Sequence, residues 1–239
     1  MANFISPFLP RILYVSCSLS DLISTTYPQI ESKLVQLRTC MATLIPLRLL
    51  APILNEHSNF AVTQAGSYRM TVKNIEYYMH MVIAATRNVN QEDLLTNIRL
   101  IRSMFMNLFD MRAVLMTRLL SKSKSKMNFT FAQSLSKYED HIIDAFCELI
   151  FKLSEDLFKP IFFKLYEWAT INEPSKDRLI TFYRTTLRLS GKLKNLFVLF
   201  ASQFLPNASA TLDLLNSSKT GNIFSFLTYL VVQILITYF

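Results

Sequence analysis

The stretch HIIDAFCELIFKL, residues 141–153, decides the fold class. Apolar side chains recur in it at positions i, i+4, i+7, i+8 and i+11: Ile142, Phe146, Leu149, Ile150 and Leu153. This spacing is typical of one face of an α-helix. Such a face must pack against another element, so a partner helix is expected nearby.

The following segment supplies that partner. Ser154 precedes Glu155 and Asp156, which is the pattern of an N-cap with acidic residues in the first helical turn. Residues 157–169 then form a second apolar segment rich in aromatic side chains. The two segments together predict a pair of helices.

The same two-helix pattern recurs along the chain. We expect Gly191 to end one helix of a second pair, residues 177–190 and 192–205. Upstream, helical spacing occurs in residues 30–43, 44–54, 59–86 and 91–120. About nine or ten helices result, in pairs of roughly 40 residues. The sequence thus predicts an all-α, HEAT-like helical-repeat solenoid of stacked antiparallel helix pairs. The alternative is a compact, irregular helical bundle.

The composition excludes several other classes of protein. Hydrophobic residues make up 51% of the 239 residues, which is too many for a disordered chain. The three glycines, Gly66, Gly191 and Gly221, are too few and too isolated for an all-β fold or for a phosphate-binding loop. We therefore expect a folded helical protein without a nucleotide site.

The residues that usually carry catalysis form no recognisable constellation. His57, His80 and His141 lack metal-ligand spacing, and Cys17, Cys40 and Cys147 contain no CxxC pair. Asp140, His141 and Asp144 are neighbours without a nucleophile close in sequence. We therefore expect no catalytic, cofactor-binding or metal-binding residues, no cofactor, no small-molecule substrate and no enzymatic activity.

The charge of the chain favours acidic partners. The formal net charge is +8, and the motif SKSKSK at residues 121–126 alternates cations with small polar residues. Lys122, Lys124 and Lys126 are candidate RNA contacts, with a merely solvated connection as the alternative.

The C-terminal residues 222–239 contain no charged side chain and approach the length of a membrane-spanning helix. Polar residues dilute the run, which favours a buried final helix over a membrane anchor. We divide the chain into N-terminal helical repeats (1–120), a basic polar loop (121–132), C-terminal HEAT-like helix pairs (133–212) and a divergent apolar tail (213–239).

Several segments resemble a known family. They are LSEDLFKPIFFKLYEWA (153–169), KDRLITFYR (176–184) and LKNLFVLFASQF (193–204), with weaker similarity in FISPFLPRIL (4–13), LIPLRLLAPIL (44–54) and LFDMRAV (108–114). They are similar to the C-terminal region of the large HEAT-repeat proteins of the U3 small nucleolar ribonucleoprotein. Beyond Thr211 the sequence departs from the family's repeats.

The resemblance implies a non-catalytic scaffold in the nucleolus of the nucleus. Its expected role is to support assembly of the small-subunit processome, processing of pre-rRNA towards 18S rRNA, and rDNA transcription by RNA polymerase I. Processome proteins and the U3 ribonucleoprotein are the implied partners, with pre-rRNA as a candidate contact. The alternative function is a helical protein anchored in a membrane by its C-terminal tail.

Overall fold

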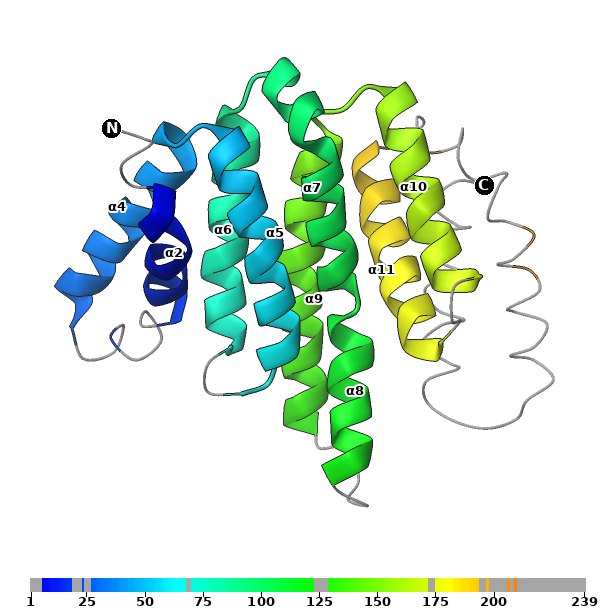
Figure 1. Cartoon of the computed structure of the whole chain (residues 1–239). Helices are drawn as coiled ribbons and strands as arrows, with labels where there is room; N and C mark the ends of the chain where they lie inside the picture. The colour runs from blue at the N-terminus through cyan, green and yellow to red at the C-terminus, as the bar shows by residue number, and fades with distance from the viewer. Residues whose placement is uncertain are drawn as a thin grey trace. The chain divides into compact units, whose positions relative to one another are not determined.

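The structure, a computed structural model, describes residues 6–18, 23, 27–67, 70–122, 129–171, 175–193, 197, 206 and 209. The described elements are the 3₁₀ helix η1 (Ser6–Phe8) and the helices α2 (Leu9–Ser18), α4 (Pro28–Leu44), α5 (Leu47–Gln64), α6 (Val72–Asn88), α7 (Gln91–Phe109), α8 (Met111–Lys122), α9 (Phe129–Ile150), α10 (Glu155–Thr170) and α11 (Lys176–Leu193). These residues contain no strand, so the prediction of an all-α fold is confirmed (Figure 1).

The chain divides into two compact units, Met1–Ser154 and Glu155–Phe239. This boundary lies inside the predicted region 133–212, because α9 belongs to the first unit. Residues 121–122 and 129–132 of the predicted loop are helical, since α8 ends at Lys122 and α9 begins at Phe129. The apolar tail at 213–239 lies outside the described residues.

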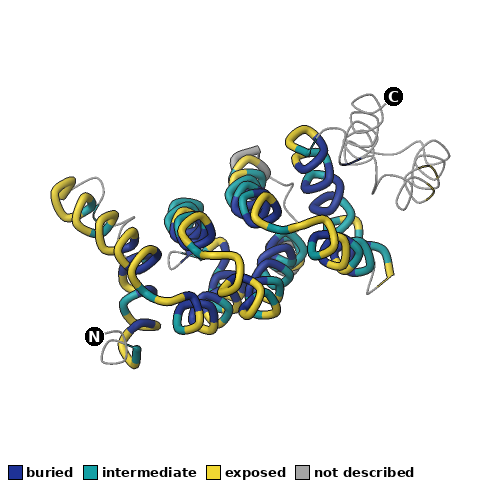
Figure 2. Tube along the Cα trace, turned by 90° about the horizontal axis from the view of Figure 1, so that it is seen from above, coloured by how far each residue is buried: buried dark blue, intermediate teal, exposed yellow. Residues whose placement is uncertain are grey.

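In the first unit, the closest packing joins helices that are not neighbours in the chain. Helix α5 lies against α7, and α6 lies against both α4 and α9. Figure 1 shows α6 antiparallel to α5 and α7, and Figure 2 shows buried positions on the sides where helices meet. This alternate packing is the arrangement of stacked helix pairs, as in a HEAT-like repeat solenoid, and not that of an irregular bundle.

The ends of these helices follow local sequence signals. Helix α5 begins directly after Pro46, and Asn90 caps α7 by accepting a hydrogen bond from the Asp93 amide at 2.7 Å. Thr71 caps α6 in the same way, with its side-chain oxygen 3.3 Å from the amide nitrogen of Asn74. Side-chain oxygens at these positions satisfy amide groups that a helix leaves unpaired.

Residues 59–86, where helical spacing was expected, do not form one continuous helix. The chain turns between α5 and α6, where Gly66 has φ of +74°, and the Gly66 amide donates to the Met70 carbonyl at 3.3 Å. Arg118 of α8 donates to the Ala65 carbonyl at 3.0 Å. The Tyr138 hydroxyl of α9 donates to the Met70 carbonyl at 2.8 Å. Distant helices therefore hold this turn in place.

The predicted helix over 91–120 is also interrupted. Helix α7 ends before Asp110, whose amide donates to the Asn107 carbonyl at 3.2 Å, and α8 begins at Met111. Arg112 then makes two hydrogen bonds to the carboxylate of Glu139 on α9, at 2.6 and 2.5 Å. The side chains of Arg112 and Glu139 are only 11% and 3% exposed, so this ion pair joins α8 to α9 away from solvent.

The second unit contains α10 packed against α11. Phe162 of α10 lies with its ring centroid 5.9 Å from Phe182 of α11 and 5.8 Å from Phe197. The guanidinium of Arg178 lies over the Trp168 ring at 5.3 Å. Gly191 does not end the preceding helix as expected, because α11 continues through it to Leu193. The remainder of the predicted helix 192–205 lies almost entirely outside the described residues.

We predict opposite effects on stability for alanine at two glycines. Gly66→Ala destabilises the chain by about 1 kcal/mol or more, because a side chain disfavours positive φ. Its Cβ would also lie 2.8 Å from Leu115 Cδ2. Gly191→Ala stabilises by about 0.5–1 kcal/mol, because Gly191 is helical and its new Cβ meets no atom within 4 Å. Urea denaturation followed by circular dichroism measures the change in the free energy of unfolding of each variant. Changes of the same sign would contradict the backbone conformations described for Gly66 and Gly191.

We also predict a large effect from Glu139→Gln. This change keeps the shape of the side chain but leaves the Arg112 guanidinium buried without its counter-charge, and should lower the free energy of unfolding by about 3 kcal/mol. The control is Arg87→Gln, which removes one partner of the more exposed Arg87–Glu148 pair and should have a much smaller effect. Similar losses in the two variants would show that burial does not govern these ion pairs.

Candidate interaction surfaces

The histidines occupy structural positions. His57 is buried, with its ring centroid 4.7 Å from Tyr78 and 5.6 Å from Phe60, and burial lowers its pKa to about 4. It is therefore neutral at physiological pH. The ring centroids of His80 on α6 and His141 on α9 lie 6.5 Å apart. Burial is the main cause of the lowered pKa of His141. In the described part of the chain, no three His, Cys, Asp or Glu side chains are placed to hold a metal ion.

The cysteines differ in accessibility. Cys17 and Cys147 are buried, and Cys40 is exposed. Burial raises the pKa of the Cys17 thiol to about 12, which leaves almost no thiolate at neutral pH. Cys17 is therefore a packed apolar side chain and a poor nucleophile.

The structure does not test the candidate RNA contacts Lys122, Lys124 and Lys126. Lys122 is the last residue of α8, and its side chain is not described. Lys124 and Lys126 lie outside the described residues. The lysines thus follow directly from the end of α8, and their contact with RNA stays a prediction.

Helix α4 carries an exposed apolar line that the sequence analysis did not single out. Ile30, Leu37 and Leu44 recur every seven residues and are 45%, 40% and 75% exposed. Tyr27, just before the helix, is 58% exposed. The spacing of seven is the signal that could have revealed this line from the sequence, because residues seven apart lie on one side of a helix.

A groove of about 250 Å³ lies at one end of this line. It is formed by the turn between α4 and α5 and the turn between α6 and α7. Leu44, Pro46 and Val89 supply the apolar parts of its wall, and polar groups, including Asn88, Asn90 and Asp93, supply the larger share. The Asn90 amide donates to the Asp93 carboxylate at 3.0 Å, so these polar groups are partly satisfied by each other.

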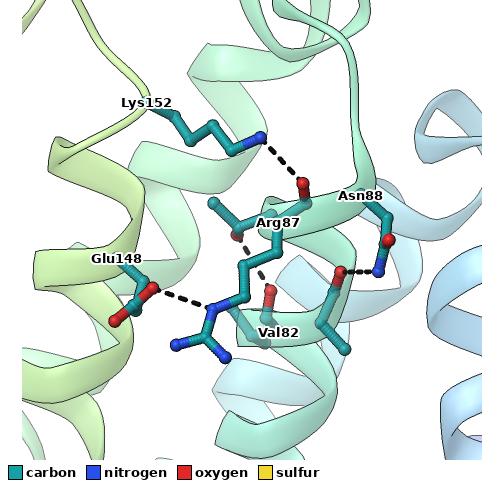
Figure 3. A network of polar contacts seen from close by, with 7 residues as sticks. Val82, Arg87, Asn88, Glu148 and Lys152 are labelled. Atoms are coloured by element: carbon teal, nitrogen blue, oxygen red, sulfur yellow. Dashed lines mark hydrogen bonds and ion pairs between the residues drawn. The ribbon is translucent and has the colours of Figure 1, made fainter.

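A polar network fixes the end of α6 beside this groove (Figure 3). Arg87 Nε donates to Glu148 Oε2 of α9 at 2.9 Å. Lys152 Nζ donates to the Arg87 carbonyl at 2.7 Å, and Asn88 Nδ2 donates to the Ala84 carbonyl at 2.7 Å. A cation that binds the last carbonyls of a helix complements its dipole, so Lys152 acts as a cap supplied by the segment after α9.

These surfaces have the chemistry of binding. The α4 line offers apolar contact area and the adjoining groove offers a mixed, mainly polar wall; both kinds of surface occur in protein interfaces. Among the described residues, no helix has the length and apolar character needed to cross a membrane. The charge-free run at 222–239 lies outside that part of the chain.

Comparison with known proteins identifies relatives. The chain is 33% identical over 228 residues to HEAT repeat-containing protein 1 of Danio rerio, covering 94% of this chain and 10% of that protein. It is 29% identical over 230 residues to HEAT repeat-containing protein 1 of Homo sapiens, with the same coverage of each chain. A third relative is the U3 small nucleolar RNA-associated protein 10 of Aspergillus niger, 32% identical over 130 residues, which cover 52% of this chain and 7% of the relative.

The chain thus spans about a tenth of the length of the two animal relatives. Their name agrees with the stacked helix pairs of the first unit, and the resemblance found in the sequence is confirmed. Residues 93–239 match the family described as the BP28CT (NUC211) domain. The match includes the residues after Thr211, so the expectation that the sequence departs from the family there is wrong. Because this match covers more than half of the chain, the protein belongs to the BP28CT (NUC211) domain family.

Proposed function

We propose that the chain is a non-catalytic scaffold in nucleolar ribosome biogenesis. The observation that carries the proposal is the similarity over 94% of the chain to HEAT repeat-containing protein 1. The further similarity to a U3 small nucleolar RNA-associated protein supports processome proteins and the U3 ribonucleoprotein as partners. The role is to support assembly of the small-subunit processome and, through it, pre-rRNA processing towards 18S rRNA and rDNA transcription by RNA polymerase I.

The geometry supports docking of proteins. Stacked helices bury their shared faces and leave their outer faces available, as in other repeat proteins. The exposed line of α4 and the groove beside Leu44 together provide an apolar area on the first unit. Contact with other proteins would remove this area from water, which is the main driving force of association.

We predict that the tagged full chain localises to the nucleolus and purifies together with processome proteins and U3 RNA. Fluorescence microscopy and affinity purification, followed by mass spectrometry and RNA quantification, measure these two properties. The matched variant lacks residues 223–239, and it should keep both properties because the proposed docking surfaces lie on α4 and at the groove beside Leu44.

The alternative, a membrane-anchored helical protein, predicts a different result. Membrane localisation that disappears with residues 223–239 would overturn the scaffold proposal. Nucleoplasmic signal without processome proteins would also contradict it, because the proposed partners would then be absent.

The basic segment supplies a second, electrostatic part of the proposal. Lys122, Lys124 and Lys126 add salt-sensitive contact with pre-rRNA, because cations release counterions from phosphates when they bind. Replacing all three by Glu should weaken RNA retention in purified complexes without changing the thermal unfolding midpoint. Retention that stays equal to that of the natural chain across a salt series rejects this role.

A further inference from the structure

The second unit contains a long stretch without a carboxylate. From residue 178 to residue 212 the chain has five cations, Arg178, Arg184, Arg188, Lys192 and Lys194, and no Asp or Glu. This imbalance is local, since the preceding helix α10 contains Glu155, Asp156 and Glu167. The positive charge of the chain is thus concentrated on α11 and the residues after it.

Three of these cations lie on one face of α11. Arg184, Arg188 and Lys192 follow each other at intervals of four residues, which places them within an arc of about 80°. Arg188 and Lys192 are exposed and Arg184 is half-buried. The other side of the helix is buried, with Phe182 and Leu189 each 1% exposed and Thr186 and Ser190 at 0%. Helix α11 therefore separates a packed face from a basic face.

The packed face fixes the direction of the basic face within the second unit. Phe182 meets Phe162 and Tyr166 of α10, with ring centroids 5.9 and 5.8 Å apart. Arg178 lies over Trp168 near the start of α11. These contacts prevent the helix from turning about its axis, so the three cations stay on one side.

One edge of the basic face is open. Gly191 lies beside Arg184 and Arg188 on the helix surface, just outside the arc of the three cations, and a Cβ placed there would meet no atom within 4 Å. A glycine inside a helix costs about 1 kcal/mol relative to alanine, and packing does not require one here. The missing side chain lets a ligand approach the helix backbone at the edge of the basic face, beside Arg188.

We propose that Arg184, Arg188 and Lys192 bind the phosphate backbone of RNA. The cations span eight residues, or about 12 Å along the helix, which is long enough to contact more than one phosphate of the same strand. The three side chains also take part in contacts within the chain. An arginine can add a phosphate to such a contact, because its guanidinium has five donors. The choice of RNA over another polyanion rests on the proposed function in ribosome biogenesis.

The test measures RNA binding by the purified full chain. The probe is a fluorescein-labelled, single-stranded RNA of mixed sequence, titrated between about 50 and 200 mM salt. The variant Arg184→Gln/Arg188→Gln/Lys192→Gln should bind more weakly and lower the slope of log affinity against log salt by about 2, since each lost phosphate contact contributes about 0.7. The matched control, Lys33→Gln/Arg48→Gln/Arg99→Gln, removes the same charge from exposed positions of the first unit and should keep the slope.

Two further measurements make the result decisive. The variant Arg184→Lys/Arg188→Lys keeps the charge and should keep the slope, which separates lost charge from a folding defect. An unchanged slope in the glutamine variant overturns the proposal, as does an equal fall in both glutamine variants. Equal competition by poly-glutamate also overturns it, because the face would then bind any polyanion.

This test is independent of the one for the proposed function. Loss of RNA binding in the α11 variant, with correct nucleolar localisation of the natural chain, supports both. If the natural chain does not reach the nucleolus but the slope falls as expected, the phosphate-binding face is retained and the biological role is rejected. If localisation is correct and the slope does not change, only the α11 face is rejected.

Discussion

The helices of the first unit bury their apolar faces mainly against helices that are not adjacent to them in the chain. Helix α5 packs against α7, and α6 packs against both α4 and α9. A single helix pair has no such partner and would leave this surface in water. The stacking contacts therefore fix the positions of the caps, turns and outer faces relative to one another. It also explains why function must lie on the surfaces that stacking leaves uncovered.

Buried polar contacts give this stack its register. Arg38 of α4 donates to the Ser16 carbonyl at the end of α2 at 2.7 Å, pairs with Glu31 at 3.1 Å and lies 4.2 Å from the centre of the Tyr77 ring of α6. Arg112 and Glu139 perform a similar task between α8 and α9. Apolar packing tolerates small shifts along a helix, but a buried charge loses its partners if the helices slide. These ion pairs favour one alignment of the layers.

The sequence predicts the helical class well because apolar periodicity records which face of a helix is buried. The segments 30–43 and 157–169 correspond closely to α4 and α10. It fails at the turn after α5, since the spacing of apolar residues hardly changes there and only Gly66 and Thr71 indicate it. Contacts such as Tyr138 with the Met70 carbonyl could not be foreseen, because they join residues 68 positions apart. The prediction that Gly191 ends a helix was wrong, because a glycine can remain inside a helix when its packed neighbours hold that helix.

The central claim is that this chain works as part of a large ribosome-assembly particle. Sedimentation of cell extract through a density gradient, with the chain and U3 RNA quantified in every fraction, tests that claim most directly. The chain and U3 RNA should be in the same rapidly sedimenting fractions. Mild ribonuclease treatment should shift the chain to lighter fractions. A chain found only among small soluble proteins, or only with membranes, would contradict it.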